Sequence, residues 1–220
     1  MRKTIVGGLL LTALFVAGCA DMGPSSKTIY SVQVSSFGNS NYPPNSTFVI
    51  VPAVGGPSQD DPEFQEYSAY LQGVLEQKGF KVAAVPGKAD FEVTLNYGIS
   101  DASTTLAGSE SGGVGYAWSN RLSTYRGRTS YIYDTTYQRT CQVVTYDVAS
   151  YHVTGQMKQV WRTQMISVGH SPDLRRVFPY LLAAGNGYLG MDSGSQQVVV
   201  MNENDPAVEQ VRGSLRPPQP

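Results

Sequence analysis

The stretch Phe91-Glu92-Val93-Thr94-Leu95-Asn96-Tyr97-Gly98-Ile99 carries the most regular pattern in the chain. Apolar or aromatic residues occupy its odd-numbered positions, and polar residues such as Glu92, Thr94 and Asn96 occupy even-numbered ones. Because successive side chains of a β-strand point to opposite faces of the sheet, this alternation predicts a strand with one buried face and one face in water.

A βαβ unit is predicted immediately before this strand. The apolar run 48–51 is typical of a central strand covered on both faces. Asp61 and Pro62 then provide an N-cap and a first helical residue, and Lys78-Gly79 ends the helix. Residues 80–85 return as a strand, which gives the unit a right-handed crossover. The apolar stripe of the helix consists of Phe64, Tyr67, Leu71, Val74 and Leu75.

Four more segments have the composition of strands, and one more has the spacing of an amphipathic helix. Ser171 is expected to cap this second helix, and Pro179 inside it is expected to bend the helix or shift its start. The helix stripe consists of Leu174, Val177, Phe178, Leu181 and Leu182, and the strands are 28–37, 137–148, 159–169 and 197–201. Together these elements predict an α+β fold: a mostly antiparallel sheet of about seven strands with one βαβ unit and two amphipathic helices packed on it.

The chain of 220 residues is 41% apolar, which is enough for one domain with a buried core. We place this domain at residues 28–203 and expect the Pro-rich segment 213–220 to be a disordered tail. In the insertion at residues 102–136, 17 of 35 residues are Gly, Ser or Thr and only five are charged. Such a composition cannot build a core, so the insertion is predicted to be a long hairpin or an irregular excursion over the sheet.

The aromatic and basic residues of this insertion are the best candidates for a binding site. Tyrosine and tryptophan rings next to guanidinium groups offer rigid contact area and hydrogen-bond donors, which suits docking of a partner protein or stacking on sugars. The alternative is that alternating tyrosines cover the outer face of a long β-ribbon. The candidate residues are Tyr116, Trp118, Arg121, Tyr125, Arg126, Arg128, Tyr131 and Tyr133.

The N-terminal segment has the pattern of an export signal. A basic start precedes fourteen uncharged residues, 4–17, which are too few for a bilayer span of ~20 residues. The sequence Leu14-Phe15-Val16-Ala17-Gly18-Cys19 resembles the lipobox of bacterial lipoproteins. The resemblance implies that a signal peptide, 1–18, is cleaved between Gly18 and Cys19, and that Cys19 carries acyl chains such as palmitate.

An acylated Cys19 is then the first residue of a mature chain that residues 19–27 tether to a membrane. Ala20 in place of an aspartate resembles the sorting signal of outer-membrane lipoproteins, although Asp21 follows it. The implied location is the periplasmic face of the outer membrane. The alternative is an ordinary secretory signal in which Cys19 is incidental.

Several short motifs follow one another along the chain in the order Thr47-Phe48-Val49-Ile50-Val51-Pro52, Glu66-Tyr67, Leu75-Glu76-Gln77-Lys78-Gly79-Phe80, Ala89-Asp90-Phe91-Glu92-Val93-Thr94, Val160-Trp161-Arg162-Thr163 and Pro179-Tyr180-Leu181-Leu182. Their order is similar to that in a family of bacterial lipoproteins, the domain-of-unknown-function family 4136 (DUF4136). The resemblance spans roughly residues 28–202. It implies an envelope lipoprotein and supplies no catalytic residues.

Motifs for catalysis and for metal or cofactor binding are not found. His152 and His170 lie on different segments and lack the spacing of metal ligands. The segment 108–112 has Glu110 where a hydrolase nucleophile elbow needs serine. Cys141 lies in an apolar strand and is expected to be a small buried hydrophobe. We therefore predict no enzyme activity, no metal site and no cofactor.

Three hypotheses follow for the function. The first is a non-catalytic binding or structural module, anchored in the membrane by its acyl chains and facing the periplasm, that contacts an envelope protein or peptidoglycan. The second is a regulator of a cell-wall synthase, and the third is a hydrolase with a non-standard site. Nucleic acid is not expected as a partner, because 16 basic and 17 acidic residues give a net charge of −1.

Overall fold

Strands and helices share the part of the chain that the computed structural model describes, which is residues 28–38, 42–43, 45–112 and 128–215. Eight strands form one open mixed sheet in the order β3-β2-β4-β6-β7-β1-β8, with β5 paired to β6. The strands are β1 (Ile29–Gly38), β2 (Thr47–Pro52), β3 (Lys81–Val82), β4 (Phe91–Ile99), β5 (Ser103–Gly112), β6 (Arg128–Asp147), β7 (Lys158–Gly169) and β8 (Gln197–Asn202).

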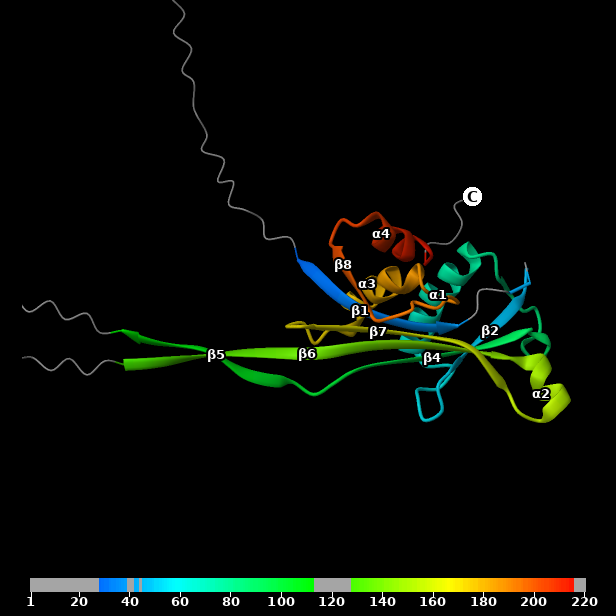
Figure 1. Cartoon of the computed structure of the whole chain (residues 1–220), viewed down its shortest axis with the longest axis horizontal. Coiled ribbons are helices and arrows are strands. Elements are labelled where there is room, and N and C mark those ends of the chain that lie inside the picture. The colour runs from blue at the N-terminus through cyan, green and yellow to red at the C-terminus, as the bar shows by residue number, and fades with distance from the viewer. Residues whose placement is uncertain (1–27, 39–41, 44, 113–127, 216–220) are drawn as a thin grey trace, which may run out of the picture.

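Three helices lie over one face of this sheet, and a fourth lies at its end (Figure 1). The covering helices are α1 (Pro62–Gln77), α3 (Leu174–Asn186) and α4 (Pro206–Gly213), and the terminal one is α2 (Val148–Thr154). The prediction of about seven mostly antiparallel strands with two helices is therefore inexact, because the described chain forms a mixed sheet of eight strands with four helices. α2 buries no residue and α4 buries only Val208 and Val211, so neither helix carries the wide apolar stripe that reveals a helix in a sequence.

The predicted βαβ unit is present. β2 and β3 are parallel and α1 connects them, while β4 is parallel to β2 on its other side. Asp61 caps α1 as predicted, since its Oδ1 accepts the backbone N–H groups of Glu63 at 2.8 Å and Phe64 at 3.1 Å. β3 is shorter than the predicted 80–85, because only two residues pair with β2 before the chain turns at Pro86.

The second predicted helix is α3, but it begins later than expected. Its N-cap is Asp173, whose Oδ1 accepts the N–H of Arg176 at 3.1 Å. Ser171 instead accepts the N–H of Asp173 through its Oγ at 3.2 Å, and so shapes the turn before the helix. α4 follows the predicted domain limit at residue 203 and packs on α3, and the predicted tail begins at its last residue, Gly213.

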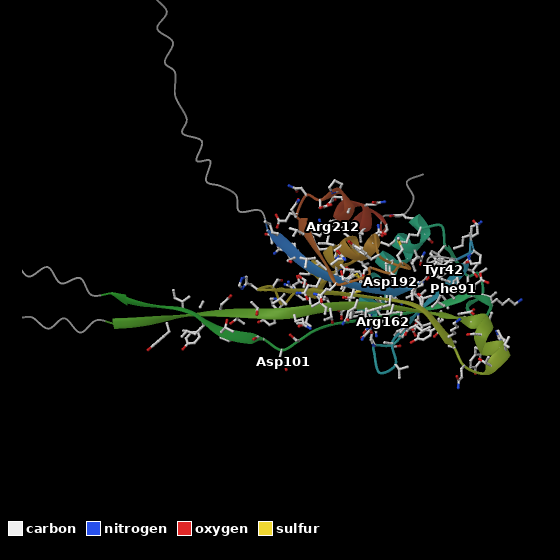
Figure 2. All side chains as sticks on the ribbon, viewed as in Figure 1. Tyr42, Phe91, Asp101, Arg162, Asp192 and Arg212 are labelled. Atoms are coloured by element: carbon white, nitrogen blue, oxygen red, sulfur yellow. The ribbon has the colours of Figure 1, made fainter. Side chains whose placement is uncertain are left out.

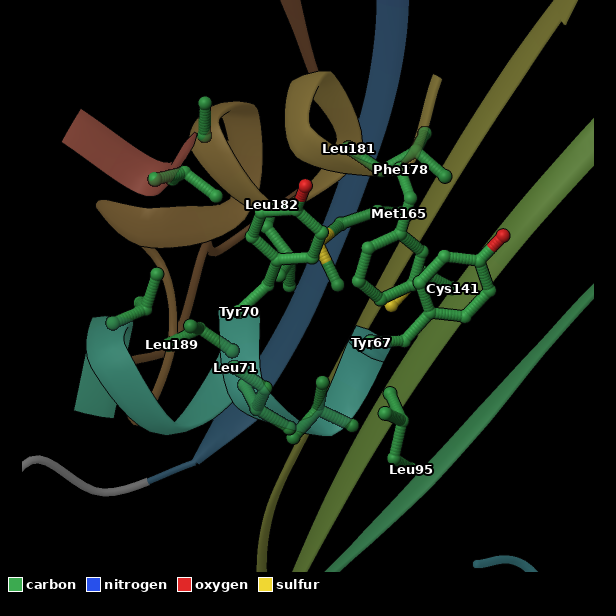
Figure 3. Packing of buried hydrophobic residues seen from close by; sticks show 14 of the residues in the cluster. Tyr67, Tyr70, Leu71, Leu95, Cys141, Met165, Phe178, Leu181, Leu182 and Leu189 are labelled. Atoms are coloured by element: carbon green, nitrogen blue, oxygen red, sulfur yellow. The ribbon is translucent and has the colours of Figure 1, made fainter. Parts of the chain in front are cut away.

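The core lies between the helices and the sheet. Phe178 of α3 stacks on Tyr67 of α1 with ring centroids 4.1 Å apart, as seen in Figure 3. Tyr67 in turn meets Tyr97 of β4 edge-on at 4.7 Å. Phe91 and Leu95, at odd positions of β4, are buried as the alternation predicts. The other face of the sheet carries no helix of the described chain (Figure 1).

Candidate functional site

A two-stranded arm projects from one end of the sheet (Figure 1). It consists of residues 103–112 and 128–136, which pair with each other from Ser103 opposite Thr136 to Gly112 opposite Arg128. From Tyr137 onward, β6 pairs instead with β7, and from Arg139 onward it also pairs with β4. The predicted insertion is therefore a hairpin over the residues that the structure describes.

The arm carries apolar side chains that the body leaves uncovered. Leu106 and Tyr133 are directly opposite each other in the pairing, so their side chains lie on the same face of the arm. Leu106 is 57% exposed, Tyr131 58% and Tyr133 63%. Ile132 has the opposite parity and is 48% exposed, so both faces of the arm present apolar surface to water.

This exposure arises because β6 is longer than the helical layer. Odd-numbered residues of β6 in the body, such as Cys141 and Val143, are fully buried on the face that α3 contacts. Tyr131 and Tyr133 continue the same alternation, but the helices lie only over the body (Figure 1). A row of side chains that is buried in the body therefore meets solvent in the arm.

Arg139 fastens the base of the arm to the helical layer. Its side chain is 2% exposed, and it donates hydrogen bonds from Nη1 to the carbonyl oxygen of Ser171 at 3.1 Å and from Nη2 to Oγ of Ser167 at 3.0 Å. None of the ion pairs in the described chain includes Arg139, and burial lowers the pKa of its guanidinium. Beside it at the surface, Nδ1 of His170 lies 3.0 Å from Oδ1 of Asp134.

Two of the eight predicted binding residues have described side chains. Tyr131 and Tyr133 are exposed on the arm, as a binding role requires. Arg128 opens β6, but its side chain is outside the description. The remaining predicted positions lie outside the described residues: Tyr116, Trp118, Arg121, Tyr125 and Arg126 of the insertion, and Gly18 and Cys19 of the lipobox.

Sequence reasoning missed Leu106 and Ile132, which complete the apolar surface of the arm. The run Tyr131-Ile132-Tyr133 contains a signal for this surface, because three successive large apolar or aromatic residues leave a strand without a polar face. A strand of that kind is either covered on both sides or exposed for contact.

A cavity of about 460 Å³ lies at the end of the body away from the arm, where Tyr42 and Phe91 form part of its wall (Figure 2). Asp90 and Asp147 also line it, but both carboxylates already accept backbone hydrogen bonds. The bonds from Thr47 lower the pKa of Asp90, whereas a general acid near neutral pH needs a raised pKa. The cavity therefore adds no support to the hydrolase hypothesis.

The remaining chemical candidates have structural surroundings. Cys141 is free and fully buried, and burial raises the pKa of its thiol, as expected for a small core residue. His152 lies in α2 and His170 follows β7. Within the described residues, no three His, Cys, Asp or Glu side chains are grouped so that they could hold a metal ion. No helix in the described part of the chain has both the length and the apolar character needed to cross a bilayer.

Comparison with known proteins gives no match by sequence, because neither a family model nor a curated protein matches the chain. Among solved structures, the crystal structure of a PDZ domain protein from Parabacteroides distasonis is 12% identical, with a TM-score of 0.38. The match covers 79% of this chain and 39% of that protein's chain. A likeness at this TM-score carries no argument about function. The resemblance to the DUF4136 family stays a prediction.

Proposed function

We propose that this chain is a non-catalytic binding or structural module, held by lipid at Cys19 on the periplasmic face of the outer membrane, whose arm contacts a component of the envelope. The arm carries the binding part of the proposal, because Leu106, Tyr131 and Tyr133 are exposed there and take no part in the core of the body. Strand pairing already orders these side chains, so contact through them costs little conformational entropy.

The anchoring part of the proposal is supported by the lipobox-like sequence that ends at Cys19. The described body begins at Thr28, nine residues later, which leaves a tether suited to holding a domain close to a membrane. Membership of the DUF4136 family, on the motifs that resemble it, is part of the same proposal.

Replacement of Cys19 by serine tests the anchor. Serine cannot form the thioether that carries the lipid, so we expect the Cys19→Ser variant to remain unacylated. The unaltered protein should sediment with outer membranes and incorporate an alkyne analogue of palmitate, and the variant should lose both properties. A variant that still sediments with membranes and keeps the gel mobility of the unaltered protein would contradict the proposal.

Exchange of Tyr131 and Tyr133 for alanine in the same acylated protein tests the binding role. We expect cross-linked adducts with envelope components to fall at least about fivefold, because aromatic anchors contribute most of the energy at typical contact surfaces. The matched control is Tyr151→Ala, which removes an exposed tyrosine from α2 at the other end of the body. Equal adduct yields from the double variant and the control, at equal abundance, would show that the arm tyrosines do not bind.

A further inference from the structure

We infer that the arm docks on the surface of the bilayer that holds Cys19, so that the component it contacts is the lipid membrane itself. The inference rests on the proposed function, because it needs the acylated anchor. The contact surface consists of Leu106, Tyr131, Ile132 and Tyr133. The direction of the arm, the reach of the tether and the chemistry of these side chains carry it.

The register of the sheet makes the arm and the tether leave the body in the same direction. Val32 of β1 and Arg139 of β6 both pair with Ser167 of β7. Because β1 and β6 are each antiparallel to β7, they are parallel to each other and lie two strand spacings, about 10 Å, apart. Toward lower residue numbers, β1 therefore runs to Ile29 and the tether while β6 runs into the arm (Figure 1).

The reach of the tether is close to the length of the arm. From Ile29 to Cys19 there are ten residue steps, which span at most about 35 Å when fully extended. From Thr136 to Arg128 the described arm extends over eight residue steps, or about 26 Å. A body held by this tether cannot retreat from the bilayer by much more than the length of its own arm.

The side chains of the arm suit the interfacial layer of a bilayer. Tyrosine is enriched at this layer because its ring contacts apolar groups while its hydroxyl stays hydrated. Leu106 and Ile132 add aliphatic surface next to the two tyrosines. Among the arm side chains that the structure describes, only Asp134 is acidic or basic, and it lies near the base in contact with His170.

The depth of this contact is limited by the backbone. A two-stranded ribbon has unpaired N–H and C=O groups along its outer edges, and hydrocarbon offers them no partners. We therefore place the arm in the headgroup layer, with its apolar side chains directed toward the acyl chains, and not across the membrane.

A fluorescent probe on the acylated protein tests the inference. Cys19 is blocked by its acyl chain, and Cys141 is fully buried, so an introduced cysteine provides the reactive thiol. Ala107→Cys places the dye at the exposed bulge beside Leu106 without removing a contact residue. Val153→Cys places it on an exposed position of α2 as the matched control. Each labelled protein is reconstituted in vesicles of phosphatidylethanolamine and phosphatidylglycerol that contain a spin-labelled lipid.

We expect the spin-labelled lipid to quench the dye at position 107 at least about threefold more than the dye at position 153, because only the arm enters the interfacial layer. Adding Leu106→Ser and Tyr133→Ser to the Ala107→Cys chain should reduce quenching to the level of the control. Equal quenching at the two positions in vesicles that retain the protein would overturn the inference and leave a protein or glycan as the partner. Protein that does not float with the vesicles would instead overturn the anchor, and with it both proposals.

Discussion

At the scale of single residues, Cys141 is the group whose burial has the most direct effect on stability. The thiol lies in the core, and burial raises its pKa by disfavouring the thiolate. In the unfolded chain the same thiol has an ordinary pKa of about 8.5. Above that pH the unfolded state releases a proton that the folded state keeps, so stability falls as pH rises.

We expect Cys141 to lower the free energy of unfolding by about 1 kcal/mol between pH 8.5 and pH 9.5. Tyr97, whose pKa burial raises to about 12, adds a similar loss only above the ordinary tyrosine pKa of about 10. The Cys141→Ala variant should be less stable at pH 7, because it leaves a small cavity, but it should decline less over this range. Urea unfolding followed by the fluorescence of buried Trp161 measures both effects. Equal declines in the two proteins would contradict a neutral buried thiol.

At the scale of elements, the contact between α1 and the end of α4 depends on a glycine. A Cβ atom on Gly73 of α1 would lie 2.1 Å from Cβ of Ser214, which follows α4. Only a residue without a side chain allows α4 to approach this closely and to bury Val208 and Val211.

Replacement of Gly73 by leucine is expected to displace α4. The cost should be about 3 kcal/mol in the free energy of unfolding, since the overpacked contact also exposes the two buried valines. Amide hydrogen exchange should show lost protection in residues 206–213 ahead of the rest of the chain. Gly87→Leu is the matched control, because no atom lies within 4 Å of a Cβ built there. Unchanged protection of α4 in the Gly73→Leu variant would contradict this account.

At the scale of the whole molecule, the arm is a separate unit attached to a complete body. β5 has no strand partner in the described chain other than β6. Leu106, Tyr131 and Tyr133 do not belong to the buried core. The body should therefore fold without the arm, while contact with the membrane should depend on it.

Replacement of residues 105–134 by Asn-Gly tests this separation. Thr104 and Thr135 are opposite each other, with their hydroxyl oxygens 3.2 Å apart, so a two-residue turn can close the shortened hairpin. We expect the free energy of unfolding to change by less than about 1 kcal/mol, because the removed strands pack on nothing else. Denaturant unfolding and circular dichroism measure the outcome. A shortened chain that fails to fold would show that the arm stabilises the body.

Elements with a regular apolar repeat could be predicted from the sequence because the signal lies within each element. The alternation in β4 and the Asp61-Pro62 start of α1 were both sufficient to locate these elements. α2 and α4 could not be found in this way, since a helix that buries two residues or none has no stripe to detect. The start of α3 was ambiguous because Ser171 and Asp173 are both able to cap a helix, and geometry selects Asp173.

The sequence by itself determined the strands, the two longer helices, the insertion at 102–136 and the aromatic character of that insertion. Only the tertiary structure decided that Tyr133 is exposed while Cys141, in the same alternation of the same strand, is buried. The difference depends on where α3 lies over β6, and α3 is about forty residues further along the chain. Only the pairing of β1 and β6 with β7 decided that the arm and the tether leave together, because strand register depends on contacts between segments that are distant in sequence.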